Sequence, residues 1–229
     1  MYAIIDKRTP LDVKNNLAKY TNDIFEFSSK GITYNSISGH PDIFIFQDEK
    51  GLVLAPNTPK SLIEFLNNKA INYSFGIKNV GENLDDSVLY NCLTSEKHFF
   101  CKKNKPDVSI QQRSSQKTLI NLPQAFARCS MFVIKDKVVT SDKGILNVLK
   151  KNVIDYFYFD PSEIKIKDHK NGFIGGTMGS INNKVFFLGN ILKHHDGEAL
   201  YKFISNQGKD VICLGNDYLY DGGSIFFVS

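Results

Sequence analysis

Short apolar segments alternate with polar or glycine-containing turns along the whole chain. The clearest example ends the sequence, where an Asp-Gly-Gly-Ser turn around Gly223 runs into the apolar residues 225–228. Turns that lead into an apolar strand in the same way recur near Gly39, Asn91, Cys129 and Gly175. Their spacing of very roughly 35 to 55 residues falls in the range of repeat arrays and propellers. The pattern therefore predicts a protein built from five repeats.

Between these turns the spacing of the apolar positions changes from that of strands to that of helices and back. Each repeat is predicted to contain two strands, a helix and a third strand, and the first repeat would share strands with the N-terminus. The predicted strands are residues 3–6, 24–27, 43–46, 52–56, 98–101, 131–134, 138–140, 156–159, 185–188 and 210–214. The predicted helices are residues 11–20, 60–68, 141–149 and 199–205, and the repeat near Asn91 has the weakest helical pattern.

These repeats predict an α/β fold, a five-bladed α/β propeller of ββαβ units that close around one axis. The hydrophobic share of 42% and the charged share of 23% are ordinary for a globular protein. A chain of 229 residues can bury roughly 70% of the surface of its unfolded form. Because no low-complexity block or long linker interrupts it, we expect a single domain over residues 1–229.

The net charge of +4 does not point to a nucleic-acid partner. The lysines are scattered, and the longest basic cluster, residues 102–105, falls in one predicted loop. A solvated face is therefore the better interpretation, and no nucleic acid is expected as a partner. The sequence carries no signal for an oligomeric state.

The chain also lacks the signals of a membrane or secreted protein. No window approaches the 18 consecutive apolar residues of a membrane span, and Asp6 interrupts the start where a signal peptide would be apolar. We expect a cytoplasmic location and no membrane partner. The four cysteines form no CxxC pair and no His-rich ligand pattern, so neither a metal, a disulfide framework nor a cofactor is predicted.

Polar residues gather at the strand entrances and helix starts of the repeats. If the repeats close around an axis, the residues at the strand entrances converge on one polar pocket. The candidates from the strand entrances are His40, Asp42, Asn91, Cys129, Ser130, Thr177, Asp221 and Ser224. The candidates from the helix starts are Asp142, His194 and Asp196.

Several of these motifs, in this order, resemble those of an uncharacterised bacterial family with the guanidino-group modifying enzyme fold, also called the pentein fold. The motifs are residues 38–42, Cys129-Ser130, and residues 140–145, 172–176, 194–197 and 221–225. The resemblance spans nearly the whole chain and implies the five-bladed propeller. The wider superfamily includes arginine and agmatine deiminases, dimethylarginine hydrolases and amidinotransferases.

Those enzymes use a Cys nucleophile, a His acid/base and carboxylates that clamp a planar guanidinium. The chemistry suits these groups, because paired N–H donors match carboxylates and attack on the central carbon needs a thiolate and a proton donor. The resemblance implies a Cys a few residues after the last Gly-Gly turn, but the aromatic pair Phe226-Phe227 stands there.

We therefore predict a central polar pocket for a small guanidino- or amino-bearing ligand, with hydrolysis or group transfer at a C–N bond as the possible reaction. Cys129 is the predicted nucleophile, and His40 and Asp42 complete the predicted catalytic set. The remaining residues are predicted to bind substrate, with Asp142 and Asp221 orienting its cation: Asn91, Ser130, Asp142, His194, Asp196, Asp221 and Ser224.

Each candidate also has a purely structural interpretation. Cys129 could be a small buried core residue, and His40 with Asp42 could serve the turn around Pro41. Asp142 and Asp196 stand where helix N-caps would be, and the last turn could need its polar residues for stability alone. At the level of function, the alternative is a non-catalytic binding or scaffold member of the fold that acts through a macromolecular partner, as a ribosome-associated initiation factor with a similar propeller does.

Overall fold

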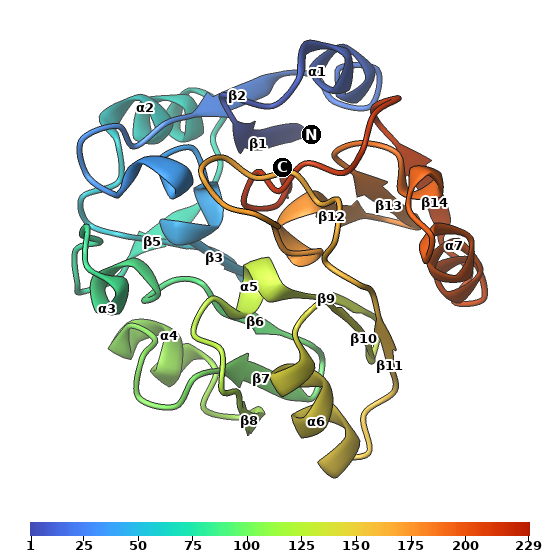
Figure 1. The fold of residues 1–229 in the computed structure, drawn as a ribbon. Coiled ribbons are helices and arrows are strands. Elements are labelled where there is room, and N and C mark those ends of the chain that lie inside the picture. Colours follow the sequence, from blue (N-terminus) through green and yellow to red (C-terminus); the bar gives the residue numbers. More distant parts are fainter.

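The computed structural model describes residues 1–229 and contains five sheets of three strands each. The sheets stand like blades around a common axis (Figure 1), which confirms the predicted five-bladed α/β propeller. In sheet order the blades are β15 (Phe226–Val228), β1 (Tyr2–Asp6) and β2 (Ile24–Phe27); β3 (Ile45–Asp48), β4 (Gly51–Leu54) and β5 (Tyr73–Phe75); β6 (Leu93–Thr94), β7 (His98–Cys101) and β8 (Thr118–Asn121); β9 (Met131–Ile134), β10 (Lys137–Thr140) and β11 (Tyr156–Tyr158); β12 (Met178–Ile181), β13 (Lys184–Phe187) and β14 (Asp210–Cys213). We number them blades 1 to 5 in this order.

All blades share one topology. The middle strand pairs antiparallel with the first strand and parallel with the third. A helix connects the two parallel strands, as parallel pairing requires, and these helices form the outer rim in Figure 1. They are α1 (Leu11–Leu17), α2 (Lys60–Asn68), α4 (Val108–Arg113), α6 (Lys143–Lys151) and α7 (Gly197–Ser205). The first strands lie nearest the axis, where β3 contacts β6 and β12 contacts β15.

Blade 1 closes the ring because it combines strands from both ends of the sequence. Strand β15 pairs antiparallel with β1, so that Phe226 stands opposite Ile4 and Val228 opposite Tyr2. Both side chains of the first pair are fully buried, in an apolar cluster of 23 residues that extends through blades 2 and 3. This pairing confirms that the first repeat shares strands with the N-terminus.

Most predicted elements begin or end within one to three residues of their predicted bounds, and two of the differences have a clear local cause. The helix expected over residues 11–20 ends at Leu17, because the amides of Lys19 and Tyr20 bond three residues back, Tyr20 N to the carbonyl of Leu17 at 2.9 Å. The strand expected to start at residue 43 starts at Ile45. Pro41 opens a single 3₁₀ turn over Pro41–Ile43, and the amide of Phe44 still bonds to the Pro41 carbonyl at 3.0 Å.

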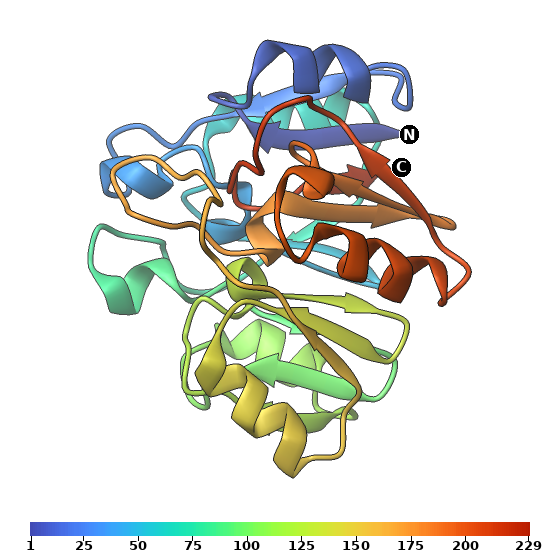
Figure 2. The same ribbon diagram turned by 45° about the vertical axis from the view of Figure 1, so that its right-hand side comes forward.

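The connections at one end of the axis are longer than those at the other. Figure 2 shows the blue segment 28–40 and the yellow-orange segment 160–174 projecting from the same end of the propeller. We call residues 160–174 the covering segment. A third connection at this end carries the short helix α3 (Leu84–Ser87), and α5 (Ala127–Ser130) leads into β9. No helix in the chain combines the length and apolar character needed to cross a bilayer.

Ring closure can be tested with Phe226→Ala. Because the side chain is fully buried on β15, its removal should lower the free energy of unfolding by about 3 to 5 kcal/mol, measured by urea denaturation. The control is Phe75→Ala, whose side chain is 49% exposed at the end of β5, and a loss below about 1 kcal/mol is expected. Equal losses in the two variants would show that β15 does not hold the ring together.

Candidate active site

The turns that precede the five first strands meet at one end of the axis. Backbone and side-chain contacts link them in a circle, each blade to the next. From blade 2 onward, Asn91 Nδ2 donates to the Asp42 carbonyl at 3.2 Å, and Ala127 N donates to the Asn91 carbonyl at 3.1 Å. Gly175 lies against the Cys129 carbonyl, and Ser224 N donates to the Gly176 carbonyl at 2.8 Å. Gly223 lies against His40 and closes the circle. The sequence-predicted convergence of the strand entrances is thus present in the structure.

Glycine is required where two of these turns touch. A Cβ atom on Gly176 would lie 1.8 Å from the carboxylate of Asp221, and one on Gly223 would lie 2.4 Å from the Cβ of His40. Gly223 also has a φ of +67°, which side chains rarely adopt. These glycines let the turns approach closely enough for their polar neighbours to face the axis.

Cys129 and Asp42 form the central contact of the site. The Cys129 thiol donates a hydrogen bond to Asp42 Oδ2 at 2.8 Å, and both residues are buried. Asn91 holds the pair from blade 3, because its Nδ2 lies 3.2 Å from the Cys129 sulfur while its Oδ1 accepts from the backbone amides of Arg128 and Cys129. The second carboxylate oxygen of Asp42, Oδ1, is buried without a partner.

His40 and Asp221 are buried beside this pair, and we call His40, Asp42, Cys129 and Asp221 together the polar floor of the site. Both nitrogens of the His40 ring lack a hydrogen-bond partner, and the ring is only 1% exposed. Asp221 accepts from the backbone amides of Phe173 at 2.8 Å and Gly223 at 3.2 Å. One ligand atom each of His40, Asp42 and Cys129 falls within 4.8 Å of the others. Side chains from blades 1, 2 and 4 are therefore within reach of one small molecule.

Sequence reasoning missed the group that backs His40. Asp6, at the end of β1, lies 4.0 Å from His40 Nε2 through its Oδ2 and accepts hydrogen bonds from Arg8 and from the Tyr220 hydroxyl at 3.1 Å. The only signal for it was an acidic residue at the end of a buried strand, followed two positions later by Arg8.

Burial shifts the ionisation of the floor. It raises the pKa of Asp42 and that of Asp221 from 3.8 to about 6 each. Burial, reinforced by the charges of those two carboxylates, raises the pKa of the Cys129 thiol well above its usual value. Burial also lowers the pKa of His40. At neutral pH the floor thus holds two carboxylates, a neutral imidazole and a thiol.

The charge of this floor favours a cation. The positive group that acts on Asp42 is Arg128, whose own pKa is lowered by burial. Two carboxylates against one guanidinium leave a net negative charge in a region that water reaches poorly. A small planar cation would offset that charge and give the free Asp42 oxygen a hydrogen-bond donor.

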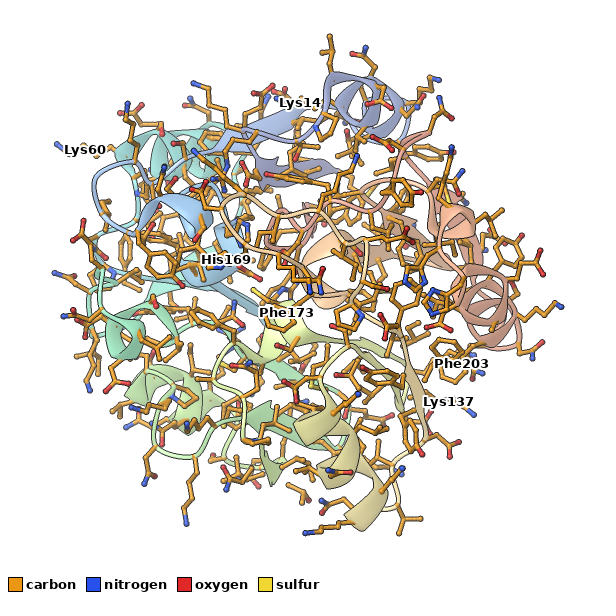
Figure 3. The ribbon with its side chains drawn as sticks, viewed as in Figure 1. Lys14, Lys60, Lys137, His169, Phe173 and Phe203 are labelled. Atoms are coloured by element: carbon orange, nitrogen blue, oxygen red, sulfur yellow. The ribbon has the colours of Figure 1, made fainter.

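A cavity of about 480 Å³ opens above the floor. Its wall is largely apolar and aromatic, and the covering segment forms one side of it. The lining residues are Tyr34, Ile37, His40, Phe126, Cys129, Ile166, His169, Lys170, Asn171, Phe173 and Asp221. His169 and Phe173 lie over the middle of the ring in Figure 3. His169 Nε2 contacts the Ser36 hydroxyl at 2.9 Å, which ties the covering segment to the segment 28–40.

Three predicted binding residues, Asp142, Asp196 and His194, lie outside the cavity. Asp142 caps α6 by accepting from the Ile145 amide at 2.8 Å, and Asp196 accepts from the Asp160 amide at 2.9 Å and caps no helix through its side chain. Together with burial, the charges of Asp160, Asp142 and Asp196 raise the pKa of Tyr158, so these carboxylates gather near β11 and line no part of the cavity. Helix starts sit at the rim of a blade and not at its inner edge, so the structure does not bring these residues to the cavity.

His194 lies with these carboxylates. It stacks on Phe159 and does not line the cavity. Its Nδ1 accepts from the Asp196 amide at 3.0 Å, so the proton of the neutral ring sits on Nε2. Asp160, His194 and His195 come within 4.8 Å of one another, but this tautomer offers no lone pair at Nε2 to a metal ion.

Three further candidates from the strand entrances, Ser224, Thr177 and Ser130, are buried at the axis. The Ser224 hydroxyl donates to the Gly175 carbonyl at 3.1 Å, and the Thr177 hydroxyl donates to the Ile174 carbonyl at 2.8 Å. The Ser130 hydroxyl is buried without a partner. Among the described groups, the set His40, Asp42 and Cys129 could hold a metal, because imidazole, carboxylate and thiolate are all zinc ligands.

The structure is similar to solved structures of a deiminase, an amidinotransferase and DDAH. Agmatine deiminase from C. jejuni matches with a TM-score of 0.55 at 11% identity, over 93% of this chain and 86% of that one. SxtG, an amidinotransferase from Microseira wollei, gives 0.55 at 9% identity over 93% and 88%. DDAH from Pseudomonas aeruginosa, complexed with citrulline, gives 0.51 at 6% identity over 97% and 92%.

At these identities the similarity defines the fold, and the chain has the pentein fold, as its motifs suggested. The sequence then places it within that class. The chain belongs to the family of unknown function DUF6873, whose pattern matches residues 4–226. None of the curated protein sequences matches it.

The raised pKa of Asp42 predicts a pH-dependent stability. The folded state binds the proton of this carboxyl more tightly than the unfolded state does. The protonated carboxyl therefore contributes to the free energy of unfolding at about pH 4, and this contribution is lost as the pH rises through about 6. Asp42→Asn keeps the shape without the charge. We expect it to be more stable than the wild type by roughly 1 to 3 kcal/mol near pH 8, with the difference vanishing near pH 4.

Urea denaturation of both proteins across this pH range measures the difference. His40 makes an opposing contribution, because its lowered pKa favours folding at higher pH. Both proteins contain His40, so this contribution cancels when the unfolding free energy of the wild type is subtracted from that of the variant. Asp136→Asn in an exposed turn is the control and should change stability by less than about 0.5 kcal/mol near pH 8. A destabilised Asp42→Asn at that pH would show that the ionised carboxylate is fully compensated in the folded protein.

Proposed function

We propose that this protein cleaves or transfers at a C–N bond of a small guanidino- or amidino-bearing cation, with Cys129 as nucleophile. The observation that carries the proposal is the 2.8 Å contact between the Cys129 thiol and Asp42 at the floor of the 480 Å³ cavity. Unpartnered atoms of Asp42 and His40 surround that contact. Buried polar groups are normally satisfied within the protein, so several open ones at one point favour a ligand that satisfies them.

The bound cation itself would activate the thiol. In the free protein, burial and two neighbouring carboxylates keep the pKa of Cys129 high and the sulfur protonated. A positive charge between Asp42 and Asp221 reverses the local field and favours the thiolate. The sulfur would become reactive only with a cation in place, which protects it from other electrophiles.

The proposed reaction then runs in two stages. The thiol proton moves to Asp42 Oδ2, Cys129 Sγ bonds to the central carbon, and the C=N electron pair moves onto nitrogen. The leaving amine takes up that proton from Asp42 and departs with the C–N bonding pair, while the lone pair on the remaining nitrogen restores the C=N bond, which leaves an S–C covalent intermediate. His40 removes a proton from water, the oxygen bonds to the carbon, the S–C pair returns to sulfur, and His40 passes its proton to the sulfur to restore the thiol. One water is consumed and one amine released, and an amine in place of water gives group transfer.

The proposed nucleophile differs in position from that of the enzymes which the fold resembles. Their thiol belongs to the last repeat, where this chain has Phe226 on β15, whereas Cys129 precedes β9 in blade 4. The pseudo-symmetry of the ring makes such a change geometrically possible, because every blade brings the entrance of its first strand to the same level of the axis. A non-catalytic binding role is the second candidate, favoured by the protonated thiol of the free protein.

Two reagents with the same leaving group test the proposal. Native protein is treated with chloroacetamidine, which is a cation, or with its neutral analogue chloroacetamide, and alkylation is mapped by peptide mass spectrometry. The rate ratio of amidine to amide at Cys129 should exceed that at the partly exposed Cys213 by about tenfold or more, since about 1.4 kcal/mol of charge attraction gives that factor. Asp221→Asn should reduce the excess, and denaturation should abolish it.

The controls separate the alternatives. Cys129→Ser must lose the selective adduct while Cys213 is still labelled. Selective labelling that appears only after treatment with a chelator would instead assign His40, Asp42 and Cys129 to a metal. Equal rate ratios at Cys129 and Cys213 in the native protein would remove Cys129 as nucleophile and favour a role in binding alone.

A further inference from the structure

A second pocket lies on the axis, on the other side of the polar floor. Its volume is about 140 Å³. Whereas the active-site cavity is lined by residues that precede the first strands, this pocket is lined by residues within them. They are Gln47 on β3, Leu93 and Thr94 on β6, Met131, Phe132 and Val133 on β9, Ser180 on β12, and also Arg128 and Ile225. The two pockets therefore open toward opposite ends of the propeller.

Arg128 is the only charged residue that lines this second pocket. Its guanidinium carbon lies 4.0 Å from the centre of the Phe226 ring, a stacking that fixes the plane of the group. The side chain is half-buried, its Nε is buried without a hydrogen-bond partner, and no carboxylate forms an ion pair with it. A guanidinium carries five N–H donors and no acceptor, so the N–H groups that the chain leaves unpaired are open to acceptors from outside it.

Two hydroxyls of the pocket can donate hydrogen bonds as well. The hydroxyls of Thr94 and Ser180 make no hydrogen bond within the chain, and they come from strands on different sides of the axis. Gln47 uses its amide N–H to hold the Phe227 carbonyl at 2.8 Å, which fixes β3 against β15 beside the pocket. A cation flanked by two hydroxyls that are free to donate complements an anion.

We propose that this second pocket binds a small oxyanion, a phosphate, sulfate or carboxylate, between Arg128 and the hydroxyls of Thr94 and Ser180. The planar guanidinium would contact two oxygens of the anion, the geometry that distinguishes such ligands from chloride. The volume limits the ligand to one small ion or to a single anionic group at the end of a larger molecule.

This site is joined to the active-site cavity through Arg128. The backbone amide of Arg128 donates to Asn91 Oδ1 at 2.9 Å, and the next residue is Cys129. Its positive charge also acts on Asp42 across the floor. An anion bound to Arg128 would weaken that attraction, so the two ends of the axis would sense each other electrostatically. The anion site itself does not depend on whether Cys129 is catalytic.

Thermal unfolding in phosphate, sulfate or acetate tests the proposal, with sodium chloride used to hold the ionic strength constant. Binding to the folded state raises the melting temperature in a saturable way, because the stabilisation follows the ratio of ligand to dissociation constant. The wild type should show this rise for at least one oxyanion, and Arg128→Met should not. The three anions separate a phosphate or sulfate site from a carboxylate site.

Because Arg128→Met could fail to fold, Ser180→Asp provides an independent variant. It places a carboxylate at the exposed rim of the pocket, where it should occupy the site of the anion and abolish the oxyanion response. Ser205→Asp, exposed at the end of α7, adds the same charge elsewhere and should keep the response. Chloride that stabilises as strongly as every oxyanion, or an undiminished response in Ser180→Asp, would overturn the proposal.

Discussion

The structure depends on crowding five turns onto one axis. Each turn contacts the next through backbone atoms, and glycines at positions such as Gly176 and Gly223 permit the close approach. The crowding buries Asp42, Asp221 and His40, although none of them forms a close ion pair. Buried charge of this kind disfavours folding, and the apolar clusters between and within the blades must offset it. The polar floor is retained against its own energetic cost, which is what a functional site requires.

The sequence predicted most of the architecture because its signals are local. Turns such as that around Gly223 and strands such as β9 are encoded by a few adjacent residues, and the repeat of these units implied the ring. The same repetition brought His40, Asp42, Asn91, Cys129 and Asp221 together in the prediction, since each precedes a first strand.

What the sequence did not reveal depends on distance in three dimensions. Asp142, His194 and Asp196 begin helices, and nothing in their local pattern says that helix starts lie at the rim of the ring. Asp6 and the covering segment contribute to the site only through contacts across the axis, such as that of His169 with Ser36. The position of Arg128 between two pockets was equally hidden, because its neighbours Phe226 and Ser180 come from other blades.

The closure of blade 1 also has a consequence for the order in which the protein is made. Strand β15 leaves the ribosome after every other strand, so β1 has an open edge while the other blades are being synthesised. Asp221 and Ser224, which complete the floor, arrive with it. A nascent chain can therefore assemble four blades but not the cavity, and until its last strand emerges the unpaired edge of β1 is exposed to pairing with other chains.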